Sequence, residues 1–395
     1  MPLIDGPAQH SHRFTDPAFA SELTTLLRQA RWDGGRTEEV LATAARIRDR
    51  DPDSWVSEWV WTAGETWAAA NRLTSRGTAA GAGAGRRYLQ AAVYYGTALS
   101  QLPRSAEDGR AVDLWRRHRV CWEESVDRGA GPVGRIEIPY ADGSLPGFFF
   151  PAPDGLGARR PLVIMHNGAY GPTSAMWGLG GAAAAQRGYH WMTFDGPGQQ
   201  AALHERGLFF RPDWEHVLTA VLDTVTARPD VDATRIAAVG IGQAGYLLPR
   251  AMAYEHRLAA AVLDPGVVDV AEAWTAALPA RLRAILARGD TTAFDREMRL
   301  ALLFAPEASA MLRTRAAGYG PAGASPSRIF TTVGAYCLGE EAAAVRTPLL
   351  TLEPEPGTPW PGQSRRLAEL VTGSVCLSAS HDEASWLDWL ERYLG

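Results

Sequence analysis

The strongest constraint on the fold is a series of short apolar runs that alternate with segments of helical periodicity. The runs are PLVIMH, YHWMTFD, RIAAVG, LAAAVLD and TPLLTLEP. Helical patterns lie between them, such as DWEHVLTAVLDTVTAR before the third run and QAGYLLPRAMAY after it. Buried strands that alternate with helices indicate a mostly parallel sheet covered on both faces. We therefore predict an α/β fold for residues 131–395, with a mainly helical insertion at about 266–335.

The first third of the chain shows helical patterns and no buried strand. Asp16 before Pro17 is a typical helix start, and Thr37 and Ser54 mark two more. We predict an all-helical domain over residues 1–130. The glycine-rich stretch 77–85 follows no strand, so we interpret it as a loop and not as a phosphate-binding site.

Composition narrows the class of protein. A net charge of -5 over 395 residues gives no electrostatic reason to expect nucleic acid. No apolar run approaches the roughly 20 residues of a membrane span, and the first residues lack the pattern of a signal peptide. The three cysteines and nine histidines show no metal-ligand spacing, so we expect a cytoplasmic protein with reduced thiols and no metal or other cofactor. The sequence contains no lysine, which excludes lysine Schiff-base catalysis.

One strand-to-helix transition carries a catalytic pattern with its central residue changed. The stretch RIAAVGIGQAGYLLPRA, residues 235–251, has the shape of a nucleophile elbow, in which a sharp turn presents a nucleophilic side chain. Gly240 and Ala244 supply the small residues that flank such a turn. Gly242 stands at the position of the nucleophile and has no side chain to attack a carbonyl.

Several motifs around this elbow resemble those of one enzyme family. HNGAYGPTSAMW, TFDGPGQQAAL, FRPDWEHVL, LDPGVVDV and WPGQSRRLAEL, in this order, resemble a bacterial α/β-hydrolase subgroup with a helical N-terminal cap. That subgroup is related to 2,6-dihydroxypseudooxynicotine hydrolase, which hydrolyses a carbon–carbon bond, and to fungal polyketide-shortening hydrolases. The resemblance covers essentially the whole chain. It implies the α/β-hydrolase fold with the helical domain as a cap over the active site, a small aromatic substrate, and a homodimer.

The resemblance also implies a catalytic serine, histidine and acid, and this chain departs from that pattern. Glycine stands at the serine position, and Gly357 stands where the acid is expected. Glu355 or Glu353 replaces this acid, or both are solvated loop charges; Asp264, at the end of another strand, is a further candidate. His381 is either the site histidine or an exposed residue at a helix start. Two altered positions favour a natural change of chemistry over a single engineered substitution.

The oxyanion hole is the part of the site that the sequence retains. Its donors would be the backbone N–H of Gln243 and that of Gly168 or Ala169, which stabilise a developing negative charge without a serine. We also expect pocket-lining side chains, although each has packing or structural hydrogen bonding as its alternative role. These are His166, Asn167, Tyr170, Trp177 and Tyr246.

Three functions fit these observations. The leading hypothesis is a non-hydrolytic enzyme of bacterial natural-product biosynthesis, in which a polyketide or polycyclic aromatic substrate supplies its own nucleophile. Such an enzyme would form a carbon–carbon or carbon–oxygen bond by cyclisation or by Michael-type or aldol-type addition. The second is hydrolysis of a carbon–carbon bond or an ester by directly activated water. The third is a catalytically inactive binding subunit.

Overall fold

The chain folds into two compact units. The computed structural model describes residues 13–75, 81–105, 108–129, 134–153, 157–354, 358–377 and 383–395. The first unit comprises Met1–Gly134 and Gly171–Ala183, and the second comprises Arg135–Tyr170 and Ala184–Gly395. The segment Gly171–Ala183 therefore belongs to the first unit, although the sequence analysis grouped it with the α/β part.

Side-chain hydrogen bonds explain the placement of this segment. The indole N–H of Trp177 donates to the carbonyl oxygen of Trp32 at 2.6 Å. His118 Nε2 lies 3.0 Å from Ser174 Oγ, and both side chains are buried. Trp177 itself begins the short π-helix η7 (Trp177–Gly181).

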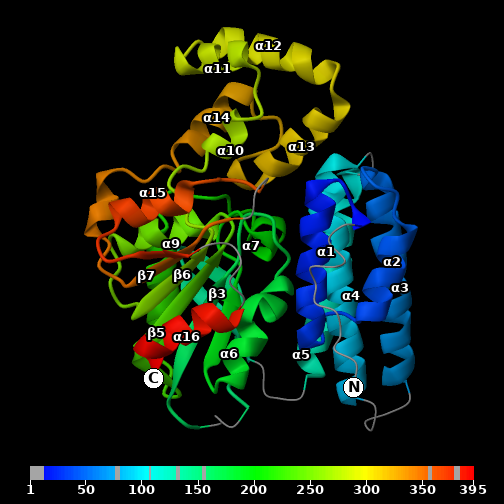
Figure 1. Ribbon diagram of the computed structural model, residues 1–395, viewed down its shortest axis with the longest axis vertical. Coiled ribbons are helices and arrows are strands. Elements are labelled where there is room, and N and C mark those ends of the chain that lie inside the picture. The colour runs from blue at the N-terminus through cyan, green and yellow to red at the C-terminus, as the bar shows by residue number, and fades with distance from the viewer. Residues whose placement is uncertain are drawn as a thin grey trace. The chain divides into compact units, whose positions relative to one another are not determined.

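Helices form the first unit, as predicted (Figure 1). They are α1 (Pro17–Gln29), α2 (Thr37–Arg46), α3 (Pro52–Thr74), α4 (Gly81–Gln101) and α5 (Ala111–Asp127), with the 3₁₀ turns η3 (Ala30–Trp32), η5 (Leu102–Arg104) and η6 (Asp108–Arg110). Trp55 lies at the centre of this unit: its ring packs on Phe19 at 4.4 Å between centroids and on Trp59 at 5.9 Å. Its indole N–H donates to Thr97 O at 2.9 Å, so the polar atom of this buried side chain is satisfied.

The helix starts test the sequence rules directly. Asp16 caps α1 by accepting hydrogen bonds from the N–H groups of Ala18 and Phe19, as predicted. The start assigned to Ser54 was wrong, because Asp51 caps α3 by accepting from the N–H of Ser54 at 2.9 Å. The predicted glycine-rich loop was also wrong over 81–85, where α4 has already begun. Residues 76–80 lie outside the described part of the chain.

The second unit is built on an eight-stranded sheet with the order β1-β2-β4-β3-β5-β6-β7-β8. The strands are β1 (Gly134–Tyr140), β2 (Gly143–Phe150), β3 (Arg160–His166), β4 (His190–Phe194), β5 (Val231–Ile241), β6 (Ala260–Asp264), β7 (Leu349–Leu352) and β8 (Val375–Leu377). Strand β2 pairs antiparallel with β4, whereas the neighbours from β4 to β8 are parallel. The predicted mostly parallel sheet is therefore confirmed.

Helices flank this sheet and fill the long connection between β6 and β7. Helices α8 (Glu215–Thr226), α9 (Ala244–Met252) and α16 (Glu383–Leu394) pack against the central strand β5. Helices α10 to α14 lie between β6 and β7 in the chain, and α11 to α14 form the yellow and orange group in Figure 1. The helices are α6 (Ala182–Gln186), α7 (Gln200–His204), α8 (Glu215–Thr226), α9 (Ala244–Met252), α10 (Glu272–Thr275), α11 (Ala280–Ala287), α12 (Thr291–Leu303), α13 (Pro306–Ala316), α14 (Pro326–Gly334), α15 (Gln363–Leu370) and α16 (Glu383–Leu394), with the turns η8 (Ala317–Tyr319) and η9 (Glu340–Ala344).

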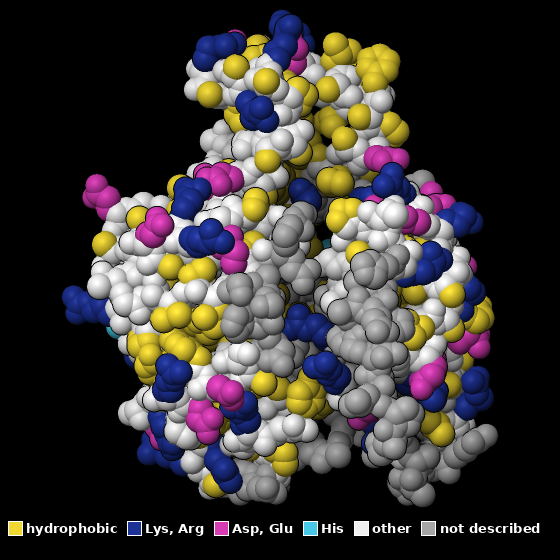
Figure 2. Space-filling view, viewed as in Figure 1, with side chains coloured by type: hydrophobic (Ala, Val, Ile, Leu, Met, Phe, Trp, Pro, Cys, Tyr) yellow, Lys and Arg dark blue, Asp and Glu magenta, His cyan; other side chains and the backbone are white. Residues whose placement is uncertain are grey.

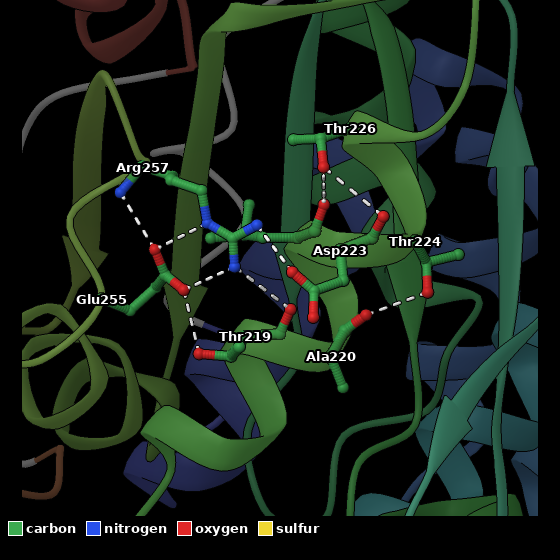
Figure 3. A network of polar contacts seen from close by, with 8 residues as sticks. Thr219, Ala220, Asp223, Thr224, Thr226, Glu255 and Arg257 are labelled. Atoms are coloured by element: carbon green, nitrogen blue, oxygen red, sulfur yellow. Dashed lines mark hydrogen bonds and ion pairs between the residues drawn. The ribbon is translucent and has the colours of Figure 1, made fainter.

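A polar network ties α8 to the segment that follows α9 (Figure 3). The carboxylate of Glu255 accepts hydrogen bonds from Thr219 Oγ1 at 2.9 Å and from Arg257 Nη2 at 2.7 Å. Arg257 Nη1 in turn donates to Asp223 at 2.7 Å. The hydrogen bond from Arg257 is the main cause that lowers the pKa of Glu255, so this largely buried carboxyl stays ionised.

The end of α12 carries apolar side chains into solvent. Leu303 and Phe304 are 77% and 82% exposed, and Figure 2 shows hydrophobic side chains on this part of the second unit. The other face of α12 holds Phe294 and Met298 in the core. None of the helices in the described part of the chain is both long and apolar enough to span a membrane.

Candidate active site

The sheet register brings three strand ends together. His166, the last residue of β3, pairs with Gly240 of β5, and Ile241 pairs with Asp264, the last residue of β6. Because these strands are parallel, the loops that leave them start at one edge of the sheet. This edge is where open α/β folds bind ligands.

The turn after β5 retains the conformation of a nucleophile elbow. Gly242 has a φ of +59°, in the left-handed region of the backbone, which is unfavourable for residues other than glycine. Its N–H donates to the carbonyl oxygen of Asp264 at 2.7 Å, and its own carbonyl accepts from Gly245 at 2.9 Å. A Cβ at this position would meet only Gly168 Cα, at 3.9 Å. The backbone is therefore fixed while the space for a side chain is open.

The loop after β3 packs tightly against this elbow. A Cβ on Gly168 would lie 2.9 Å from Ile241 O and 3.2 Å from Gln243 N, so only glycine allows this approach. Asn167 Oδ1 accepts a hydrogen bond from the N–H of Gly168 at 2.8 Å. Asn167 is buried, and its side chain thus shapes the loop.

A fully buried glutamine, Gln199, holds the same loop from the other side. Its Nε2 donates to the carbonyl oxygens of Asn167 at 2.6 Å and Gly168 at 2.9 Å. Its Oε1 accepts from the N–H of Gly196 at 2.8 Å. No local sequence pattern indicates Gln199, because its role depends on contacts with a loop about thirty residues away in the chain.

Two backbone N–H groups beside Gly242 have no hydrogen-bond partner among the described residues. They belong to Ala169, in the loop after β3, and Gln243, in the turn before α9. Gly168, the other expected donor, already donates to Asn167, which leaves Ala169 as the donor from this loop. Both residues are at least nine-tenths buried. Two unpaired donors at an edge where strand ends converge form a place for an oxygen acceptor.

The side chain of Gln243 contacts a tyrosine of the inserted helical segment, and a tyrosine of the β3 loop bonds to the same segment. Tyr319, in η8, donates its hydroxyl to Gln243 Oε1 at 2.5 Å, and burial raises the pKa of Tyr319 well above its usual value. Tyr170 donates its hydroxyl to Arg315 O at 2.7 Å, while 43% of its surface is exposed. The sequence analysis did not find Tyr319, since its partner lies 76 residues away and no local pattern relates them.

Two of the expected pocket residues are core residues in the structure. His166 is fully buried between the rings of Phe194 and Trp214, whose centroids lie 4.8 and 5.4 Å away. Burial lowers the pKa of His166 to about 3, so it stays neutral and is a weak base. Tyr246 is also buried, packs on Tyr336 and reaches Pro212 O at 3.4 Å, because this face of α9 points into the core. Tyr246 thus takes the packing role that was its alternative, whereas His166 is packed in the core without the structural hydrogen bond that was expected as its alternative role, as far as the described residues show.

Of the residues expected to act as catalytic acid or base, the structure describes some and not others. Asp264 lies beside the elbow, where its carbonyl oxygen accepts the N–H of Gly242. Glu355 and His381 lie outside the described residues, so their roles stay predictions. Glu353, at the end of β7, accepts the N–H of Gly362 with Oε1 at 2.8 Å, while its buried Oε2 has no partner among the described residues. The N–H of Glu353 donates to Leu377 O at the end of β8, four residues before His381 in the chain.

Strand order, elbow and convergent loops define an α/β-hydrolase fold, and comparison with known proteins agrees. The crystal structure of 2,6-dihydroxy-pseudo-oxynicotine hydrolase superposes with a TM-score of 0.71, covering 93% of this chain and 95% of that one at 18% sequence identity. At this identity the likeness establishes the fold.

The family follows from the sequence. The model of the family described as esterase FrsA-like matches residues 13–275, two thirds of the chain, so the protein belongs to this family of α/β hydrolases. Hydrolase LUC6 of a Fusarium species is 35% identical over 277 residues, and the 20-hydroxy-prefusarin hydrolase FUS2 of Gibberella moniliformis is 32% identical over 273 residues. Each alignment covers 67% of this chain but only 64% of the fungal protein.

Proposed function

We propose that this protein is a hydrolase that adds water to the carbonyl group of a small organic substrate without forming a covalent bond to the enzyme. The observation that carries the proposal is the pair of N–H groups, from Ala169 and Gln243, that lie beside Gly242 and have no partner in the part of the chain that the structure describes. Oxygen that becomes negative when water attacks the carbonyl carbon accepts both hydrogen bonds. One donor of this kind contributes about 10²–10³ in rate.

The remaining chemistry needs a group that removes a proton from water. His381 stays our predicted base, and a carboxylate would orient it. Of the described carboxylates, Glu353 has a buried oxygen without a partner and Asp264 adjoins the elbow. The tetrahedral intermediate then collapses, and the protonated base returns its proton to the departing carbon or oxygen atom. Hydrolysis of an ester and of a carbon–carbon bond next to a carbonyl both follow this course.

The relatives favour hydrolysis over the bond-forming chemistry that the missing serine first suggested. The family is described by an esterase, and LUC6 and FUS2 are both named hydrolases. Bond formation is a second candidate for one reason: Gly242 leaves open space where a nucleophilic side chain would stand. A nucleophilic group of the substrate itself would occupy that space and attack the same activated carbonyl.

Isotope labelling separates these functions. The purified protein is incubated in H₂¹⁸O with a panel of aryl esters and aryl 1,3-diketones. We expect one ¹⁸O atom in the acid product and an unchanged intact protein mass during turnover. An isomeric product without ¹⁸O would establish the second candidate instead. A substrate adduct on the protein would contradict both, since both omit an enzyme nucleophile.

The variant Gly242→Ser tests whether the absence of a nucleophilic side chain at this position prevents a covalent adduct. The open space accommodates the hydroxyl, so a serine there supplies the missing nucleophile if a base is in place. We expect an acyl adduct in the mass spectrum of this variant after treatment with an aryl ester. Gly242→Ala is the control, because it imposes the same backbone strain without a hydroxyl.

A further inference from the structure

We propose that the side-chain amide of Gln243 is a second hydrogen-bond donor of the active site. It binds an oxygen of the substrate other than that of the attacked carbonyl, and Tyr319 positions it. This inference rests on the proposed function, because it assigns the substrate a second acceptor near the carbonyl that the backbone N–H groups hold.

The contact with Tyr319 fixes which end of the amide is free. The hydroxyl oxygen of Tyr319 lies 2.5 Å from the amide oxygen of Gln243. Such a short distance is typical of O–H···O hydrogen bonds and is shorter than N–H···O hydrogen bonds. The hydroxyl therefore faces the amide oxygen and donates to it. Nε2 then forms the opposite arm, and it has no partner among the described residues although Gln243 is only 3% exposed.

A second unpaired group lies in the same aromatic cluster. The hydroxyl of Tyr336 is buried and has no hydrogen-bond partner in the described part of the chain. Its ring packs edge-on against Tyr319, with 5.3 Å between centroids. Buried polar groups are rarely left unpaired in folded proteins. The Nε2 of Gln243 and the hydroxyl of Tyr336 are thus two buried groups without a described partner, on residues that both contact Tyr319, and they indicate a place that a ligand completes.

The chemistry of these groups defines the kind of oxygen they bind. An amide carries no charge, and burial raises the pKa values of Tyr319 and Tyr336, so both tyrosines stay neutral. Neutral donors suit a carbonyl or ether oxygen better than a carboxylate, which needs a compensating charge when buried. The backbone N–H and the side-chain amide of Gln243 belong to one residue. They therefore suit two oxygens that are a few bonds apart in one substrate.

A pair of probes tests the second donor. We choose 1-phenylbutane-1,3-dione, which has two carbonyl oxygens, and 1-phenylbutan-1-one, which has one. Titration of each into ¹⁵N-labelled protein measures affinity and follows the side-chain amide signals of Gln243. We expect the dione to bind about tenfold more tightly, as one additional hydrogen bond allows, and to shift these amide signals.

Variants separate positioning from folding. In Gln243→Leu and Gln243→Met we expect the two probes to bind with equal affinity, because the side-chain donor that distinguishes the dione from 1-phenylbutan-1-one is gone. Tyr319→Phe keeps the packed ring, moves the amide signals of Gln243 in the free protein, and reduces the preference. The control is Tyr88→Phe, which removes a matched hydroxyl that donates to Asn71 Oδ1 at 2.6 Å in the first unit. It should leave affinity and amide signals unchanged.

The outcomes distinguish this inference from the proposed function. Equal affinity for both probes in the wild-type protein would overturn the second donor alone, as would a preference that survives in Gln243→Leu. A preference that Tyr319→Phe leaves intact, with unmoved amide signals, would overturn the positioning role. Failure of both probes to bind would overturn the inference together with the proposed carbonyl site.

Discussion

Two buried glutamines flank the loop after β3, and they use their side chains in opposite ways. Gln199 donates to two carbonyl oxygens and accepts from one N–H, so both ends of its amide are paired with the backbone. Among the described residues, Gln243 has only its side-chain oxygen paired, and its Nε2 has no partner. A saturated amide holds the frame of the site, whereas an oriented and unsaturated one is available to a ligand.

The largest effect is expected from Gln199→Leu, which tests the supporting role. The substitution leaves the carbonyl oxygens of Asn167 and Gly168 and the N–H of Gly196 buried without their partner. We expect the free energy of unfolding to fall by about 3 kcal/mol, measured by urea denaturation. Gln200→Leu is the control, since that amide donates one exposed hydrogen bond, to Tyr170 O at 3.1 Å. An unchanged midpoint for Gln199→Leu would show that the loop does not depend on this amide.

A smaller effect is expected at His166, the residue before this loop. Its ring nitrogens are also unpaired among the described residues, but it sits in an aromatic stack with no partner that orients it. Burial lowers its folded pKa from 6.5 to about 3. Between these values the unfolded chain binds a proton that the folded chain does not, so stability falls as pH falls, by about 1.4 kcal/mol per pH unit.

The variant His166→Phe removes this proton uptake. At pH 5 the wild-type protein should have lost about 2 kcal/mol through His166, and the variant should not. The measurement is the difference in unfolding free energy between the two proteins at pH 7.5 and at pH 5. If both proteins showed the same pH dependence, the imidazole of His166 would be hydrated or paired in the folded protein. His166 would then be, like Gln243, a residue whose nitrogen takes a partner from outside the described chain.

The contrast between the two amides also shows what a sequence can predict. The apolar runs were sufficient to predict the sheet, because a strand that is buried on both faces consists of consecutive apolar residues. The turn pattern around Gly242 was sufficient for the sharp turn itself, because that turn is local, while the role of the Gln243 N–H stays a prediction. Gln199 and Tyr319 could not be found in this way, since each acts on a segment that only the tertiary fold brings near.

The pocket residues suggested by the sequence depend on the tertiary fold in the same way. Tyr246 was expected in the pocket, but helical periodicity does not tell which face of α9 meets the core and which meets the loop. Trp177 follows the β3 loop in the chain, yet its indole is bonded to Trp32 in the first unit. Distance along the chain from a catalytic motif is thus a poor guide to the lining of a pocket.

Gly242→Ala should have a moderate effect and tests whether the elbow itself is strained. A φ of +59° is unfavourable for alanine, while the space around the new methyl group is open. We expect a loss of about 1 kcal/mol in unfolding free energy from backbone strain alone. Gly143→Ala is the matched control, because a Cβ added there would meet no described atom within 4 Å and the φ of Gly143 is not positive. A neutral Gly242→Ala would show that the turn relaxes when a side chain is present.

The smallest change in stability is expected from Gln243→Leu, the same substitution as in Gln199→Leu. It removes an unpaired Nε2, which favours the folded state, and deprives Tyr319 of its acceptor, which disfavours it. These effects oppose each other, so we expect the unfolding free energy to stay within about 1 kcal/mol of the wild-type value. Urea denaturation under the conditions used for Gln199→Leu makes the comparison direct. A loss as large as that of Gln199→Leu would show that Gln243 has a structural role like that of Gln199. Its side-chain amide would then not be a donor to a ligand.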